Sequence, residues 1–118
     1  VLQKLIAAYK LWHECLPHMP KTSRYTLAAR IDALLLATIE HTVTACFLQK
    51  TEKLQEVKHA ITALDTGKCL LLLAWEIRAL DEKKYIALSA PLAEAGKMLG
   101  GWLNQLIKQN SSVKMEEK

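Results

Sequence analysis

Apolar residues recur at helical spacing in four stretches of the chain, and short polar or proline-containing segments separate these stretches. In the first, about residues 2–16, they fall on one face from Leu2 to Leu16. Intervals of three and four residues are typical of amphipathic helices. The same spacing predicts three further helices over about residues 24–49, 52–80 and 85–108.

The connections between these helices are short. Pro17 and Pro20 interrupt the first connection, and a polar run of Asp, Glu and Lys at residues 81–84 forms the last. Short connections force consecutive long helices to run antiparallel. The pattern therefore predicts an all-α fold, one antiparallel up-down-up-down four-helix bundle over residues 1–108. Residues 109–118 are polar and charge-balanced, and we predict a disordered tail there.

Two of the predicted helices carry more apolar surface than one small bundle buries. Residues 69–75 are apolar on every side of the third helix, and Leu36, Val43 and Phe47 widen the stripe of the second. Large exposed apolar patches usually mark an interface, so we predict self-association; the alternative is that loops or helix ends cover these residues.

Glycines within the fourth helix add to this prediction. Each costs about 1 kcal/mol relative to alanine, and close approach of another backbone would offset that cost. Fraying beyond Gly101 is the alternative, but Trp102 needs a site that buries it. The predicted oligomer interface comprises Phe47, Leu70, Leu73, Gly96, Gly100 and Trp102.

The positive charge is concentrated near the start of the chain. The formal net charge is +4, and residues 1–31 account for all of it, with five basic residues against Glu14 alone. A localised basic region suggests a polyanionic partner, nucleic acid above all. Charge alone slightly favours the alternative, a solvated helix face that keeps the protein soluble. No apolar run is long enough to cross a membrane and no signal segment opens the chain, so we expect a cytoplasmic protein with reduced cysteines.

The sequence contains no constellation typical of an enzyme, and we predict neither a catalytic residue, a metal nor a cofactor. The tight groupings of histidine and cysteine are His13 with Cys15 and His41 with Cys46, which we interpret as surface histidines and buried thiols. Glu40 lies in a largely apolar helix, and we expect Arg78 or Lys68 to pair with it there. A general acid at Glu40 is the alternative.

Three segments together resemble a known family. They are Met19-Pro20-Lys21-x-x-Arg24-Tyr25-x-Leu27-x-x-Arg30-Ile31, the run Leu71 to Leu80, and Glu94-Ala95-Gly96-Lys97-Met98-Leu99-Gly100-Gly101-Trp102-Leu103. In their order along nearly the whole chain they resemble the accessory variability determinant (Avd) proteins of diversity-generating retroelements. The chain is also similar, more distantly, to the four-helix-bundle proteins encoded in ribosomal RNA intervening sequences.

The resemblance implies a homopentameric ring of bundles with no catalytic residues of its own. It further implies a basic surface that binds RNA or DNA, and association with the element's reverse transcriptase. On the family's motifs, Lys21, Arg24, Arg30 and Arg78 match basic positions and are the predicted nucleic-acid-binding residues. The alternative is a protein-only oligomeric scaffold of the intervening-sequence type, with no nucleic-acid role.

Overall fold

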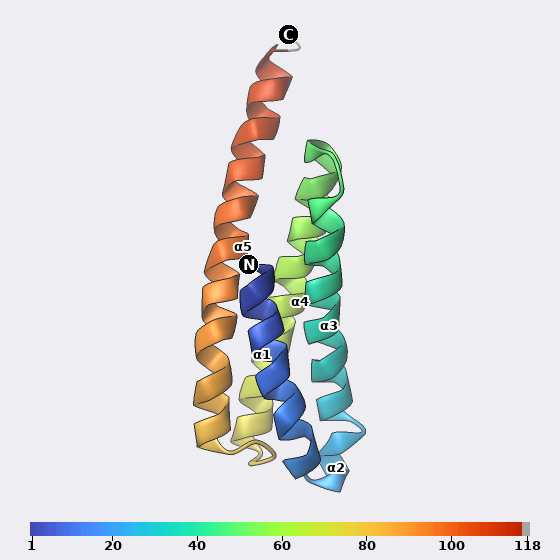
Figure 1. Cartoon of the computed structure of the whole chain (residues 1–118), viewed down its shortest axis with the longest axis vertical. Coiled ribbons are helices and arrows are strands. Elements are labelled where there is room, and N and C mark those ends of the chain that lie inside the picture. Colours follow the sequence, from blue (N-terminus) through green and yellow to red (C-terminus); the bar gives the residue numbers. More distant parts are fainter. Residues whose placement is uncertain (117–118) are drawn as a thin grey trace.

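The computed structural model describes residues 1–116 of the chain, and the surroundings of side chains as far as Ser111. Its elements are α1 (Leu2–Cys15), η1 (Leu16–His18), α2 (Lys21–Arg24), α3 (Leu27–Cys46), α4 (Lys50–Glu76) and α5 (Glu82–Glu116). Four of these are long helices that form a bundle, and α2 is a single turn before α3 (Figure 1). The prediction of an all-α chain with four long helices is confirmed.

Each long helix packs against two others. The first helix, α1, contacts α3 and α5, and α4 also contacts α3 and α5, so the four helices surround one core. The molecule measures 58 × 22 × 21 Å. It is long because α3, α4 and α5 continue past the first residue of α1 (Figure 1). We call the part with η1, α2 and the α4–α5 connection the four-helix end, and the part with the α3–α4 turn and the last turns of α5 the three-helix end.

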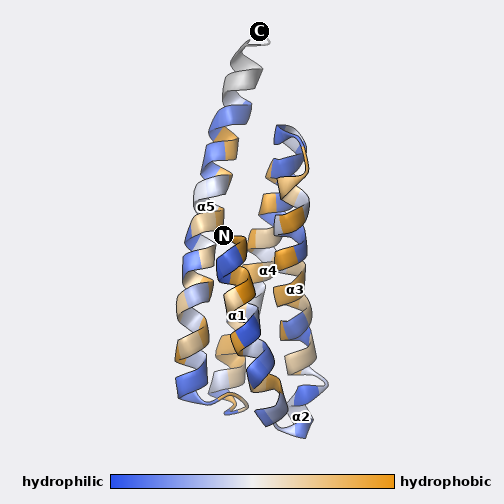
Figure 2. Ribbon diagram, in the orientation of Figure 1, coloured by the Kyte–Doolittle hydropathy of each residue, from blue (hydrophilic) through white to orange (hydrophobic). Residues whose placement is uncertain are grey.

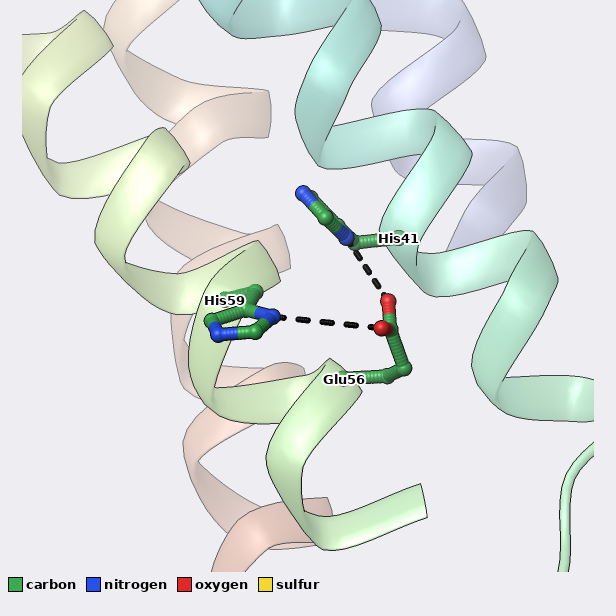
Figure 3. Close-up of side chains that lie close together, drawn as sticks. All are labelled: His41, Glu56 and His59. Carbon is green, nitrogen blue, oxygen red and sulfur yellow. Dashed lines mark hydrogen bonds and ion pairs between the residues drawn. The ribbon is translucent and has the colours of Figure 1, made fainter. Parts of the chain in front are cut away.

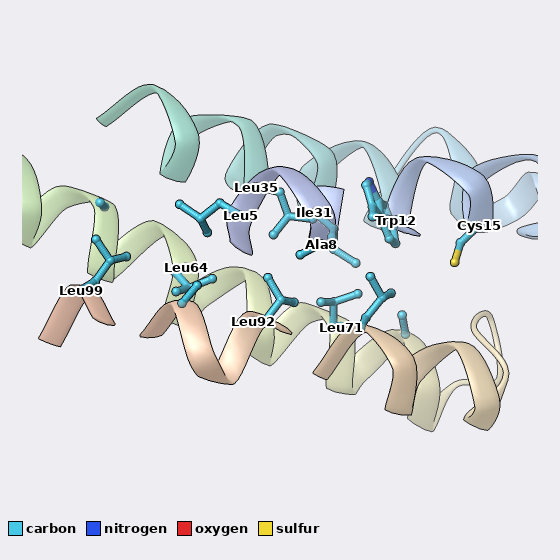
Figure 4. Close-up of a cluster of buried hydrophobic side chains, with 14 of the residues drawn as sticks. Leu5, Ala8, Trp12, Cys15, Ile31, Leu35, Leu64, Leu71, Leu92 and Leu99 are labelled. Carbon is cyan, nitrogen blue, oxygen red and sulfur yellow. The ribbon is translucent and has the colours of Figure 1, made fainter. Parts of the chain in front are cut away.

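The core is centred where α1 covers the other helices. Trp12 is fully buried there, in a cluster of buried side chains that includes leucines and alanines of all four long helices (Figure 4). The indole Nε1 of Trp12 donates a hydrogen bond to Oδ1 of Asp32 at 3.1 Å, and the Tyr9 hydroxyl donates to the same oxygen at 2.8 Å. The polar tips of two aromatic residues of α1 are thus tied to one carboxylate of α3.

The helix α4, the third long helix of the prediction, ends earlier than the sequence predicts. Its last residue is Glu76, and Arg78 adopts a positive φ of 62°. The amide of Ala79 donates to the Ala74 carbonyl at 2.9 Å, and that of Arg78 donates to Trp75 at 3.0 Å. This pair of bonds is a Schellman motif, which ends a helix with one left-handed residue, usually glycine. Because arginine and not glycine occupies that position, the sequence lacks the usual signal for the end of a helix.

The helix α5, the fourth long helix of the prediction, is longer than predicted at both ends. Asp81 caps it, because its Oδ1 accepts a hydrogen bond from the backbone N–H of Lys84 at 2.8 Å. The helix continues through the predicted disordered tail as far as Glu116, since no glycine or proline follows Gly101 to interrupt it. Residues 117 and 118 of that predicted tail lie outside the described residues.

The expected ion pair of Glu40 is not formed. Glu40 is exposed, on the same side of α3 as Leu36 and Val43, so its carboxylate needs no buried partner. Arg78 lies at the four-helix end, whereas Glu40 lies near the end of α3 at the three-helix end, and Lys68 instead faces Asp65 at 3.7 Å. The sequence interpretation was wrong because it took the largely apolar composition of the helix around Glu40 as a sign that Glu40 is buried.

Candidate nucleic-acid interface

Segments far apart in the sequence meet at the four-helix end. His18 and Pro20, from the connection after α1, and Arg78 and Lys84, from around the α4–α5 connection, line one depression there. Lys21 follows Pro20 directly, so two of the predicted basic residues, Lys21 and Arg78, belong to this end of the bundle (Figure 1). Hydropathy colouring shows hydrophilic residues at α2 and at the first turn of α5 (Figure 2).

Lys21, Arg30 and Arg78 are exposed. Arg30 lies in the first turn of α3, one turn of helix from α2. Among the described residues, no carboxylate lies within 4.0 Å of any of these three cationic groups. Their side chains are therefore available to phosphate oxygens.

Arg24 has a different role. Its Nη2 donates to the carbonyl of Pro17 at 2.9 Å and to that of Met19 at 3.1 Å. The half-buried guanidinium holds the connection between α1 and α2 in place. Its two carbonyl partners make it a structural residue of this end.

Carboxylates share this end with the basic residues. Lys84, which sequence inspection did not select, lies 3.8 Å from Asp81. Its presence beside the depression follows from the fold and not from any motif. Lys21, Arg30 and Arg78 have no such carboxylate neighbour among the described residues.

The residues predicted for the oligomer interface fall into two groups. Phe47 is 85% exposed and Leu73 43% exposed, and a Cβ added at Gly100 would meet nothing within 4 Å. Leu70 and Trp102 are partly buried against the core of the same chain, and a Cβ at Gly96 would come within 3.1 Å of the Lys68 Nζ. The first group is open to a second chain, whereas intramolecular packing accounts for much of the second.

The three cysteines differ in their exposure to solvent. Cys15 is buried as expected, and burial, above all other causes, raises the pKa of its thiol. Cys46 is exposed, so the interpretation of a buried thiol is wrong there, and Cys69 is exposed as well. Cys46 is the last residue of α3, where no α1 residue covers it, and Cys69 lies on the exposed apolar side of α4.

One group of side chains was missed by sequence inspection. His41 of α3 and Glu56 and His59 of α4 place their ligand atoms within 4.8 Å of one another (Figure 3). The signal in the sequence is weak, because only the Glu-x-x-His spacing of the last two is local. Their meeting with His41 depends on how α3 and α4 align.

A slender helical bundle with exposed cations at one end and exposed apolar side chains along its helices is typical of a binding protein that acts through partners. Comparison with known families agrees, and the chain belongs to the bAvd-like family, whose model matches residues 1–106. This is a family of accessory proteins and is not known as catalytic, and the predicted kinship with Avd proteins is confirmed. No curated protein and no solved structure matches the chain. In the described part of the chain no helix is long and apolar enough to cross a membrane.

Proposed function

We propose that this chain is a non-catalytic accessory protein that assembles into a homopentameric ring, binds RNA or DNA, and holds a reverse transcriptase near its template in retroelement-driven sequence diversification. Membership of the bAvd-like family supports the accessory role. The reducing cytoplasm is the compartment we propose, because two of the three thiols are exposed.

The observation that carries the nucleic-acid role is the convergence of unpaired cations at the four-helix end. Lys21 and Arg30 come from one segment and Arg78 from another, and none has a carboxylate partner among the described residues. Phosphate contacts require cations of this kind, free of internal partners.

The backbone of Arg78 supports the same conclusion. A non-glycine residue in the left-handed region costs about 1–2 kcal/mol, and Arg78 has a φ of 62°. Glycine would relieve that strain, so an arginine there is best explained by a use for its side chain. Its position beyond the end of α4 presents the guanidinium to solvent.

Apolar side chains support the assembly. Leu36, Val43 and Phe47 recur on one face of α3, and each exposes more than a third of its surface. Leu72 and Leu73 of α4, and Ile77 directly after its last residue, are 40–54% exposed. Covering such surface is favourable by about 25 cal/mol per Å², which provides a driving force for association between copies.

The test replaces Lys21, Arg30 and Arg78 together. In Lys21→Glu/Arg30→Glu/Arg78→Glu we expect RNA affinity to fall at least tenfold at low salt. The slope of log affinity against log salt should also become shallower by about 2, since each lost contact to single-stranded RNA removes about 0.7. Arg24 stays unchanged, because its loss would disturb the fold.

The matched control is Lys50→Glu/Lys58→Glu/Lys108→Glu. These three exposed lysines lie on α4 and α5 away from the four-helix end, and the change in net charge is the same. Equal losses in both triple variants would mean that only net charge matters. If the unmodified protein binds no RNA or DNA while it retains a protein partner in pull-down, the protein-only scaffold is the correct function.

A further inference from the structure

The structure assigns a divalent transition-metal site, with Zn²⁺ as the best-fitting ion, to His41, Glu56 and His59. The three side chains come from adjacent antiparallel helices and point toward one another (Figure 3). This site is independent of the proposed nucleic-acid role and lies at the opposite end of α3 from α2.

Distances within the group suit a shared ion. Nδ1 of His41 lies 2.7 Å from Oε2 of Glu56, and Nδ1 of His59 lies 3.8 Å from Oε1 of the same carboxylate. Ligands of tetrahedral zinc lie about 2.0–2.2 Å from the ion, which sets them roughly 3.3–3.5 Å apart. Shifts of about 1 Å or less in partly exposed side chains bring all three to that separation.

A simple ion pair explains only half of this arrangement. The hydrogen bond between His41 and Glu56 is complete at 2.7 Å, but 3.8 Å is too long for one between His59 and Glu56. The imidazole of His59 is thus brought to the carboxylate without bonding to it. A cation between them would bond to both.

A fourth residue orients His59. Nε2 of the Gln55 side-chain amide lies 3.1 Å from Nε2 of His59, the ring nitrogen that faces away from Glu56, and a half-turn of the amide exchanges its nitrogen for its oxygen there. With its oxygen turned to that nitrogen, Gln55 accepts the Nε2–H and leaves the lone pair of Nδ1 free for a metal. Histidine ligands of metals nearly always have such a partner on the second nitrogen.

The chemistry of the three ligands indicates which ion would bind, and their exposure indicates that the site is open to a further ligand. Two imidazoles and one carboxylate suit zinc and its first-row neighbours better than calcium or magnesium, which prefer oxygen. Glu and His at i and i+3 on a bundle helix are a recurrent metal-binding pair. Between 23% and 48% of each side chain is exposed, so water or a group from a partner can complete the coordination. The bound ion would join α3 to α4 where α1 no longer covers them.

The test is zinc titration of the full, untagged chain in the Cys46→Ser/Cys69→Ser background, since exposed thiols also bind zinc. We expect one equivalent per chain and a rise in melting temperature with zinc, because the ion binds the folded state. His59→Gln, which replaces an exposed ligand, should weaken binding at least tenfold and abolish the rise. Cobalt substitution should give visible absorption in the parent and not in this variant.

The matched control is His18→Gln, which removes an exposed imidazole at the four-helix end and should change zinc affinity less than twofold. Circular dichroism verifies that both variants fold. The assignment is overturned if the parent binds no stoichiometric zinc, if His59→Gln binds as tightly as the parent, or if His18→Gln loses as much affinity.

Discussion

The two ends of the bundle use the same helices differently. At the four-helix end α1 closes the core, Trp12 is fully buried, and two helix termini are satisfied by a Schellman motif and an aspartate cap. At the three-helix end α1 is absent, and Phe47 remains 85% exposed. Buried, fully bonded groups stabilise a single chain, whereas exposed apolar groups gain free energy only when another molecule covers them.

Substitutions should therefore have different consequences at the two ends. A change at the buried or hydrogen-bonded groups of the four-helix end should lower the free energy of unfolding of the chain itself. A change at the exposed apolar residues should leave that free energy nearly constant and weaken association.

Removing the central aromatic residue should have the largest effect. Trp12→Ala leaves a cavity where the side chain is fully buried, and we expect a loss of about 3–5 kcal/mol in denaturant unfolding. Phe47→Ala is the matched change at the three-helix end, where we expect less than about 0.5 kcal/mol in dilute solution and a lower assembled mass. Equal losses in unfolding would remove the distinction between the two ends.

The carboxylate that joins α1 to α3 comes next. Asp32→Ala leaves the Tyr9 hydroxyl and the Trp12 N–H without their acceptor, and we expect a loss of about 2 kcal/mol. Asp65→Ala removes an exposed carboxylate from α4 and should cost under about 0.5 kcal/mol. A loss in Asp32→Ala no larger than this would mean that water replaces the acceptor at no cost.

Burial, and then the bond to Asp32, also raises the pKa of Tyr9. A raised pKa means that the folded state favours the neutral phenol, so the stability that Tyr9 contributes is lost as the pH rises through the folded pKa, above about 10. The alkaline fall in stability should be smaller in Tyr9→Phe.

At the α4–α5 connection we expect a gain of stability. Arg78→Gly removes the strain of the positive φ and should raise the free energy of unfolding by about 1 kcal/mol, while RNA binding weakens. Arg78→Ala keeps the strain and loses the same side chain, so it should weaken RNA binding without the gain. A loss of stability in Arg78→Gly would show that the arginine side chain stabilises the connection.

The smallest effect concerns the contact between the start of α1 and α5. The hydrogen bond from Lys4, 2.8 Å from Glu94, holds the pKa of the Glu94 carboxyl below its usual value. Its contribution is present above the unfolded pKa and is lost as the pH falls through the lower folded one. Carboxyl NMR titration should show the pKa of Glu94 rising toward normal in Lys4→Met and much less in Lys97→Met, because Lys97 contributes least.

The helices could be predicted from the sequence because each buries a stripe of apolar residues whose spacing is local information. Their ends could not be predicted equally well, since Arg78 occupies a position where glycine is the usual signal. Glu40 was misjudged because spacing identifies an apolar face but not whether another helix covers it.

Prediction of the sites depended on how far their residues lie apart in the sequence. The basic region of residues 1–31 was identified because its charges cluster along the chain. The family resemblance selected Lys21 and Arg30 within it, and Arg78 outside it. The structural role of Arg24 depends on carbonyl groups of a connection whose shape no spacing rule gives. His41, Glu56 and His59 were missed because their meeting requires the alignment of α3 with α4.

Association between copies is the claim on which the proposed ring and its accessory role depend, and solution mass by light scattering tests it most directly. We expect a mass five times the 13.3 kDa of one chain, and a return toward the mass of one chain in Phe47→Glu/Leu73→Glu. A well-folded species of 13.3 kDa at all concentrations of the unmodified protein would contradict the account.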